Sequence, residues 1–240
     1  MFHYTVSQWI FIFFWYCFLG WIWECCYVSV VEGIKNKKWK WINRGFLNGP
    51  MLPIYGFAAI SILIGTMNVR DSIFLVFVMG ALAATIMELV TGSVMERLFH
   101  VKYWDYSNMP LNYKGYICFF VSLFWGVLSV ILVDVIHVPI ENVLLQCPII
   151  AIEIIAFLLM GIFAYDFHDS LNAALDVKEL LEKLSEKFSE NHPLHGKVLS
   201  HLEKTRSRRL ALHLKHNPTA ISRKYKEAFE ELKEFLKDRK

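Results

Sequence analysis

Apolar residues gather in five long runs along the chain, and each is long enough to cross a membrane as a helix. A helix needs about 20 mostly apolar residues to span the hydrocarbon core of a bilayer. Within the runs the apolar positions are continuous rather than alternating, which argues against transmembrane strands. The pattern therefore predicts an all-α polytopic membrane protein with about five transmembrane helices. The runs cover residues 8–31, 46–66, 71–95, 115–137 and 143–165.

Charged residues are concentrated behind the last apolar run. The chain has 240 residues, of which 55% are hydrophobic, and the last 63 carry 16 of its 25 lysines and arginines. This contrast predicts a transmembrane domain over 1–169, followed by a basic cytoplasmic tail over 170–240. The tail has a helical pattern in three stretches, which asparagine and proline residues separate. These stretches are 170–188, 197–214 and 219–238.

The positions of the basic residues predict which side of the membrane each loop occupies. Five of them follow the first apolar run, namely Lys35, Lys37, Lys38, Lys40 and Arg44. Loops rich in lysine and arginine stay on the cytoplasmic side. The N-terminus is therefore expected outside the cytoplasm and the C-terminus inside it.

The sequence matches itself when it is shifted by 64 residues. Identical pairs include two glutamates, a lysine and an asparagine, which shared apolar composition does not explain. The match predicts two parallel helix–loop–helix repeats, over about 8–66 and 71–137, followed by a fifth helix over about 143–165. The polar pairs are Glu24 with Glu88, Glu32 with Glu96, Lys38 with Lys102, and Asn48 with Asn112.

Three carboxylates, Glu24, Glu88 and Glu153, fall inside predicted membrane helices. A charge near the bilayer centre costs about 2.5–3.5 kcal/mol on insertion scales, so each glutamate needs a reason to be there. One interpretation is a polar cavity that binds a cation, a proton or a polar substrate. The other is a set of neutral, hydrogen-bonded glutamates that hold helices together. The sequence leaves both open.

The segment 44–56 contains two prolines and three glycines at the start of the second apolar run. Such residues are unfavourable inside a helix, so they predict either a broken helix at a site or gate, or a proline-initiated helix with a kink. With its counterpart at 103–115, the segment supplies further candidates. The candidates for substrate or ion binding are Glu24, Glu88, Glu153, Asn48, Asn112 and Tyr55, and a cytoplasmic polar cluster is formed by Arg44, Trp104, Asp105 and Tyr106.

These two segments resemble a known family. The runs RGFLNGPMLPIYGF and YWDYSNMPLNYKGYICF, in this order, are similar to the bacterial CmpB-like family of type IV ABC-transporter, or permease-like, membrane proteins. The resemblance covers roughly residues 8–165 and implies a multi-pass protein of a bacterial plasma membrane. Family members often have Trp-Trp-Asp-Tyr where this chain has Tyr103-Trp104-Asp105-Tyr106. The family assigns no role to individual residues.

The expected partners follow from what the chain contains. It has no G-x-x-x-x-G-K-[ST] phosphate loop, so ATP would be used by a separate ATPase subunit. Besides the lipid bilayer, a homodimer is expected, because four or five helices are few for a translocation path. No cofactor is expected, and the irregular spacing of Asp166, His168 and Asp169 argues against a metal site. Nothing in the tail predicts binding to nucleic acid.

Three functions stay open at this point. The repeat, the intramembrane glutamates and the proline-rich segment favour a permease-like transport protein of unknown substrate, which is not itself an enzyme. As an alternative, the basic tail is typical of a non-catalytic scaffold or regulator that recruits a partner. Paired carboxylates near the cytoplasmic interface would also suit a membrane-embedded enzyme that acts on lipids.

Overall fold

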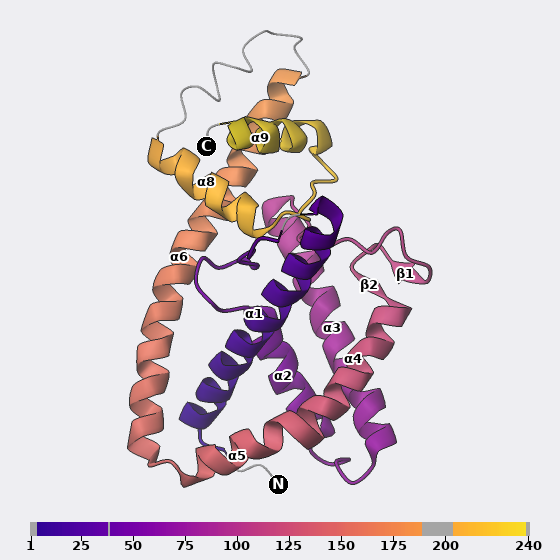
Figure 1. Ribbon diagram of the computed structural model, residues 1–240, viewed down its shortest axis with the longest axis vertical. Helices are drawn as coiled ribbons and strands as arrows, with labels where there is room; N and C mark the ends of the chain where they lie inside the picture. The colour runs from indigo at the N-terminus through magenta and orange to yellow at the C-terminus, as the bar shows by residue number, and fades with distance from the viewer. Residues whose placement is uncertain (1–3, 38, 189–203, 239–240) are drawn as a thin grey trace. The chain divides into compact units, whose positions relative to one another are not determined.

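The computed structural model describes residues 4–37, 39–188 and 204–238 (Figure 1). Apart from one short hairpin, the described residues with regular secondary structure are helical, which confirms the all-α membrane fold. The hairpin pairs β1 (Asn112–Tyr113) with β2 (Ile117–Cys118) in antiparallel register. The helices are α1 (Val6–Asn36), α2 (Pro53–Thr66), α3 (Ile73–Phe99), α4 (Phe119–Ile131), the π-helix η1 (Leu132–Ile136), α5 (His137–Gln146), α6 (Ile149–Phe188), α8 (Lys204–His216) and α9 (Lys226–Asp238).

Four helical stretches of the described chain are long and apolar enough to cross a membrane, one fewer than the five runs predict. They cover Val6–Ile34, Ile73–Phe99, Phe119–Gln146 and Ile149–Lys183. The second predicted span, 46–66, contains only the 14-residue helix α2. At 1.5 Å per residue α2 is about 21 Å long, which is short of a bilayer core of about 30 Å.

Proline chemistry explains where α2 begins. Residues 46–52 are not helical, and Pro53 occupies the first turn of the helix. Proline suits this position because its missing N–H would have no intrahelical partner there. Leu52, the residue before the helix, donates its backbone N–H to the carbonyl of Cys17 in α1 at 3.0 Å. The segment is therefore a proline-initiated helix that follows an irregular stretch.

The turn expected between the last two apolar runs, at 138–142, is helical instead. The helix of α4 continues through η1 and α5 to Gln146, and Pro139 lies in the first turn after the π-helix. The break comes at Cys147, whose backbone is extended because Pro148 follows it. From Ile149, α6 then runs unbroken for 40 residues, so the predicted tail helix 170–188 is the end of the fifth apolar helix. Residues 162–188 contain neither glycine nor proline to stop it.

The chain forms two compact units, each built from three segments. Unit 1 contains residues 1–23, 50–91 and 106–164, and unit 2 contains 24–49, 92–105 and 165–240. The predicted division at residue 169 stays a prediction, because these units follow packing rather than the membrane boundary.

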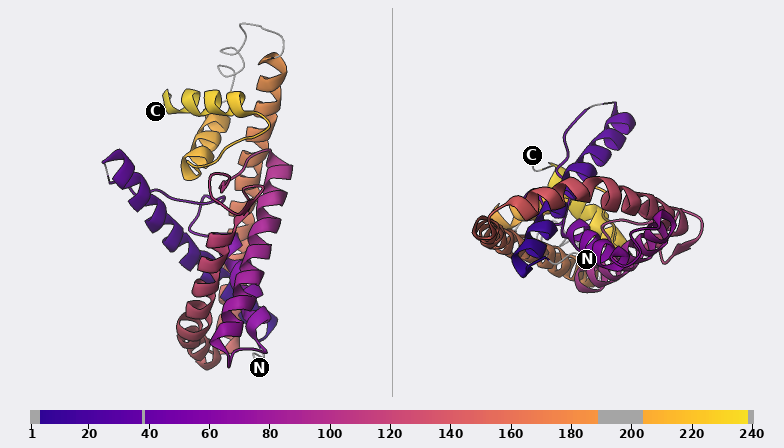
Figure 2. Two further views of the ribbon diagram at one scale, coloured as in Figure 1. Left: turned by 90° about the vertical axis from the view of Figure 1, so that its right-hand side faces the viewer. Right: turned by 90° about the horizontal axis from the view of Figure 1, so that it is seen from below.

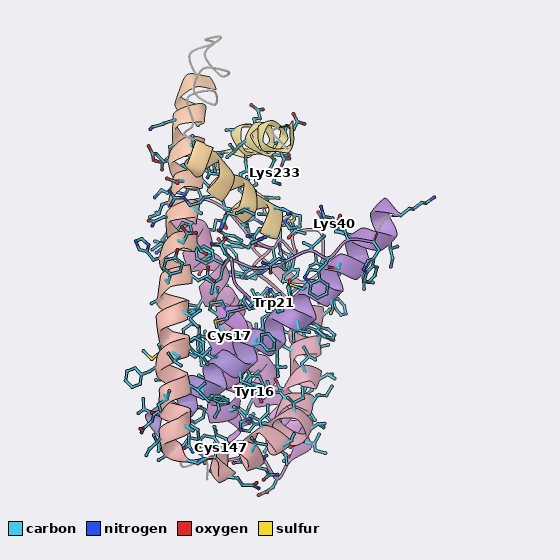
Figure 3. The ribbon with its side chains drawn as sticks, turned by 60° about the vertical axis from the view of Figure 1, so that its left-hand side comes forward. Tyr16, Cys17, Trp21, Lys40, Cys147 and Lys233 are labelled. Atoms are coloured by element: carbon cyan, nitrogen blue, oxygen red, sulfur yellow. The ribbon has the colours of Figure 1, made fainter. Side chains whose placement is uncertain are left out.

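Unit 1 has a core that gathers side chains from α1, α2, α3, η1, α5 and α6. Small residues let its helices approach closely: Gly20 lies against the ring of Tyr55, and Gly80 of α3 lies against Ser129 of α4. Tyr16, labelled on α1 in Figure 3, belongs to this core. Its buried members are Ile12, Tyr16, Ala59, Ile62, Leu63, Val76, Ala84, Val133, Leu144 and Ile152.

Unit 2 has a separate core, in which α8 and α9 pack against the C-terminal part of α6 (Figure 2). Leu181 of α6, Leu210 of α8 and Phe229 of α9 are fully buried in it. Lys233 of α9, labelled in Figure 3, extends its ammonium over the Phe229 ring and donates a hydrogen bond to the carbonyl of Ala220 at 2.7 Å. The apolar faces of the tail helices are thus used within the chain itself.

The close contact between α3 and α4 predicts different effects of one substitution at two glycines. A Cβ at Gly80 would overlap the side chain of Ser129, whereas a Cβ at Gly161 of α6 would meet no atom within 4 Å. We expect Gly80→Ala to lower the thermal unfolding temperature in detergent, since overpacking costs about 1–3 kcal/mol. Gly161→Ala is the matched control and should raise or preserve it, because alanine favours helix by about 1 kcal/mol. Equal effects of the two variants would contradict this packing.

Candidate functional site

The loop after α1 is a polar centre of unit 2, and we call residues 43–49 the NRGFLNG loop. Its Arg44 is buried, as an arginine can be only when its guanidinium is paired. Nε lies 3.5 Å from a carboxylate oxygen of Glu24, while Nη2 donates to the Tyr103 carbonyl at 2.9 Å and to Thr219 Oγ1 at 2.8 Å. The predicted residues Glu24 and Arg44 therefore form an ion pair that also ties the loop to the start of the α8–α9 connection.

The end of the same loop is bound to α6 by two aspartates. Asp166 accepts the backbone N–H groups of Asn48 at 3.0 Å and of Gly49 at 2.8 Å. The Asn48 amide donates to Asp169 at 3.0 Å and to Ser170 at 3.2 Å. Hydrogen bonds to a carboxylate are among the stronger ones in proteins. Asn48, a predicted site residue, is therefore held by groups on α6 that the sequence analysis did not connect with it.

The C-terminal end of α8 binds the middle of the loop. Asn217 donates its side-chain amide to the Gly45 carbonyl at 2.9 Å, and the Gly45 N–H donates to the His216 carbonyl at 3.4 Å. The side chains of Asn43 and His216 lie 3.5 Å apart. Gly45 has a φ of 139°, a conformation that favours glycine strongly over other residues. The tail therefore closes over the NRGFLNG loop within unit 2.

A buried histidine lies beneath this contact. The Tyr103 hydroxyl is 2.9 Å from Nε2 of His213, and both side chains are buried in the unit 2 core. Burial, and secondly the nearby His216, lowers the pKa of His213 to about 4. Burial also raises the pKa of Tyr103, so a neutral histidine faces a neutral tyrosine at pH 7.

The remaining members of the predicted cytoplasmic cluster are distributed between the two units. In unit 2, the Asp105 carboxylate lies 3.0 Å from the Lys102 ammonium and 3.1 Å from the Arg223 guanidinium, and Trp104 packs against the core. In unit 1, the Tyr106 hydroxyl donates to the carboxylate of Glu88 at 2.8 Å.

Glu88 is the most deeply buried of the three predicted membrane carboxylates. It lies in α3, within a candidate span, and is 5% exposed. Its partner Tyr106 follows it by 18 residues, and Arg44 follows Glu24 by 20. In both predicted repeats, the loop after the helix therefore supplies a side chain to the helix glutamate. The partners themselves are not equivalent, since Arg44 aligns with Asn108 in the repeat.

Two further predicted residues, Asn112 and Tyr55, are held by contacts within a turn and between helices. Asn112 holds its own turn, because its amide donates to the Met109 carbonyl at 2.7 Å and its oxygen accepts the Gly115 N–H at 3.0 Å. Tyr55 packs on Gly20 and lies edge-on to Trp125, with ring centres 5.8 Å apart. These contacts describe helix and turn packing.

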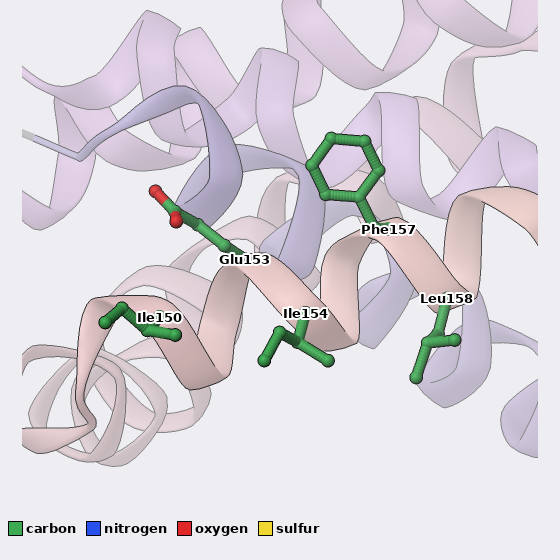
Figure 4. Close-up of a pocket in the computed structure, with 5 residues that line it drawn as sticks. All are labelled: Ile150, Glu153, Ile154, Phe157 and Leu158. Atoms are coloured by element: carbon green, nitrogen blue, oxygen red, sulfur yellow. The ribbon is translucent and has the colours of Figure 1, made fainter.

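Glu153 lies near the start of the candidate span Ile149–Lys183. It lies in the second turn of α6, only about 6 Å of helical rise from Ile149, so its carboxylate does not need to stay at membrane depth. Its side chain is exposed and borders a shallow, open depression with four apolar side chains (Figure 4). The depression is lined by Ile150, Glu153, Ile154, Phe157 and Leu158.

The structure also reveals polar groups that the sequence analysis did not select. Asp166, Asp169 and His213 bind the NRGFLNG loop or lie beneath it, and His137 is fully buried in unit 1 between Tyr4 and Tyr16. The sequence signal that could have identified Asp166 and Asp169 is the polar run 166–170, which directly follows an apolar helix. No three His, Cys, Asp or Glu side chains in the described parts of the chain are grouped to hold a metal ion.

Four helical stretches of membrane length and apolar composition among the described residues define this chain as a polytopic helical membrane protein. Comparison with known families makes the assignment narrower. Residues 11–171, more than half of the chain, match the family described as "Putative ABC-transporter type IV". The chain belongs to this CmpB family and is thus a transport-related membrane protein. No curated protein and no solved structure gives a match to it.

The anchoring of the NRGFLNG loop on α6 can be tested at Asp166. In Asp166→Asn, a single oxygen remains to accept two backbone N–H groups, so one charge-assisted hydrogen bond is lost. We expect a loss of about 1–3 kcal/mol in the free energy of unfolding, and faster hydrogen exchange at the amides of Asn48 and Gly49. Asp71→Asn, at an exposed turn position, is the control and should change neither quantity. Unchanged exchange in Asp166→Asn would refute the anchor.

The burial of His213 predicts a loss of stability in acid. The unfolded chain takes up a proton near pH 6.5, whereas the folded chain resists it until about pH 4. Unfolding is therefore favoured increasingly as the pH falls through this window, by at most about 3 kcal/mol. His213→Gln should show a smaller loss in unfolding experiments between pH 7 and pH 4. His168→Gln, at an exposed position of α6, should keep the acid response of the original chain.

Proposed function

We propose that this chain is the permease-like subunit of a transporter whose energy comes from a separate ATPase subunit. The observation that carries the proposal is the arrangement around Glu24 and Glu88. Each carboxylate lies in a helix of candidate membrane length and is bonded by a side chain of the loop that follows the helix. Membership in a transport-related family supports the permease-like role, and the lack of a phosphate-loop motif in the sequence supports a separate ATPase subunit.

Carboxylates at these positions are suited to a cation or a strongly polar solute. Arg44 neutralises Glu24, and Tyr106 donates to Glu88, so both acids are occupied by the protein in this conformation. A cargo with positive charge or hydrogen-bond donors would compete for the same oxygens when the loops move. Differential contacts of this kind are what allow a ligand to shift a conformational equilibrium.

The surroundings of the proposed subunit follow from its charges. The lysines and arginines after α1 and in the tail favour a cytoplasmic position for both, with the N-terminus outside. We propose a bacterial plasma membrane as the location, in line with the family resemblance. A homodimer would provide eight long helices, a more plausible number for a translocation path than four.

The two alternative functions gain less support. A scaffold that recruits a partner through its tail would leave apolar tail surface available, but Leu210, Phe229 and Leu232 are buried in the core of unit 2. For a lipid-acting enzyme, Asp105 is a weak acid–base candidate because Lys102 and Arg223 neutralise it.

Transport is tested by complementation. A strain lacking the gene would be screened for altered uptake or efflux of labelled metal cations, amines, amino acids and sugars, and the affected solute would then be followed. We expect Glu88→Gln to lose at least about 90% of the complementing activity at normal abundance in the membrane, since a positive cargo loses its counter-charge. Glu230→Gln, an exposed position of α9, should complement fully.

Tyr106→Phe tests in the same assay whether the Tyr106 hydroxyl competes with the solute for the carboxylate of Glu88. It removes the hydroxyl that occupies Glu88 but leaves the carboxylate, so transport should persist with altered apparent affinity for the solute. Full activity in Glu88→Gln, or no solute that distinguishes the deletion strain, would overturn the proposed function.

A further inference from the structure

His137 occupies an unusual place in unit 1. It is the first residue of α5, directly after the π-helix η1, and its side chain is fully buried. A π turn adds a residue to the helix and rotates the face that follows it, a feature frequent at functional sites. A buried imidazole within a helix of membrane length needs partners at both ring nitrogens.

Tyrosine hydroxyls provide both partners. The Tyr4 hydroxyl lies 3.1 Å from Nε2 of His137, and the Tyr16 hydroxyl lies 3.0 Å from Nδ1. Tyr4 also donates to a carboxylate oxygen of Glu141 at 2.8 Å. The other oxygen of Glu141 lies 3.6 Å from Arg70, whose second nitrogen donates to the Val133 carbonyl in η1. These five side chains form a continuous hydrogen-bonded row that ends in an ion pair.

The directions of these hydrogen bonds follow from the number of protons. Tyr4 has one hydroxyl proton, and ionised Glu141 can only accept, so that proton points to Glu141. Tyr4 must then accept from His137, which places the imidazole proton on Nε2. Nδ1 is left without a proton and accepts from Tyr16. With Glu141 ionised, the row therefore runs from Tyr16 through His137 and Tyr4 to Glu141.

Protonation of Glu141 would reverse this order. A neutral carboxyl group donates to Tyr4, Tyr4 then donates to Nε2, and the imidazole proton must be on Nδ1, from which it is donated to Tyr16. The two arrangements differ by one proton, which comes from water, and His137 remains neutral in both. The charged or titratable groups that face Glu141 include Arg70, Tyr4 and His137.

We propose that Tyr4, Tyr16, Arg70, His137 and Glu141 form a proton-binding switch, in which uptake of one proton by Glu141 moves the His137 proton from Nε2 to Nδ1. Glu141 is the place of uptake because its side chain is 21% exposed while His137 is fully buried. The change extends to Tyr16 in the core of unit 1, because the Tyr16 hydroxyl keeps its proton but no longer donates it to Nδ1 of His137. The switch does not depend on the proposed transport function.

Nitrogen-15 NMR of the full chain in lipid nanodiscs tests the switch directly. The nine histidines would be labelled, and the His137 signals identified by their loss in His137→Gln. At pH 8 we expect the Nε2–H tautomer. On acidification the signals should change to those of the Nδ1–H tautomer, with the midpoint at which the infrared carboxyl band of Glu141 appears. Retention of Nε2–H through that titration, or formation of a doubly protonated ring, would overturn the proposal.

Three variants make the test specific. Glu141→Leu removes the acceptor of Tyr4, so the Nδ1–H tautomer should be present at every pH. Tyr4→Phe, which keeps the ring and the packing, should uncouple the His137 tautomer from the Glu141 band. Glu230→Leu, at an exposed carboxylate of α9, should behave as the unmodified chain. A pH-dependent tautomer in Glu141→Leu would assign the effect to another group and refute the switch.

Discussion

A loop that enters the interior of a helical protein has to find a partner for its backbone N–H and C=O groups. The NRGFLNG loop meets this constraint by using the rest of unit 2. Asp166 accepts the backbone N–H groups of Asn48 and Gly49, while Asn217 and His216 bind Gly45. The buried charge of Arg44 is balanced by Glu24, and its guanidinium also donates to oxygens of Tyr103 and Thr219. The middle of α6 and the C-terminal end of α8 are therefore positioned by a segment of seven residues.

Hydropathy predicted the helical class of the fold because it depends on apolar length alone. It did not predict the boundaries, which depend on backbone details. Pro53 set the start of α2 and reduced the second span to 14 residues, while Pro139 was accommodated after a π turn and did not break its helix. Pro148 made the break instead. Proline therefore started one helix, was accommodated in a second and ended a third stretch. The outcome depends on whether the proline sits where a backbone N–H would have no intrahelical partner.

Sequence reasoning selected several residues that share contacts in the structure, including Glu24 with Arg44 and Glu88 with Tyr106. The two glutamates could be selected from the sequence because a charged side chain is costly inside a membrane. Asp166, His213 and His137 were not selected, because their importance comes from partners more than 100 residues away in sequence. Asn112 shows the converse: the repeat singled it out, but its hydrogen bonds remain within its own turn. A role of the selected residues in binding cargo stays a prediction.

The short length of α2 has a consequence for the lipid around it. A helix of about 21 Å in a core of about 30 Å creates a hydrophobic mismatch. Where α2 meets lipid, the bilayer would have to thin locally, or water and headgroups would have to reach further along the helix axis. Either response raises the effective dielectric constant near the ends of α2. Polar groups near the ends of α2 would then be stabilised by two effects, solvation from the deformed bilayer and pairing with other side chains.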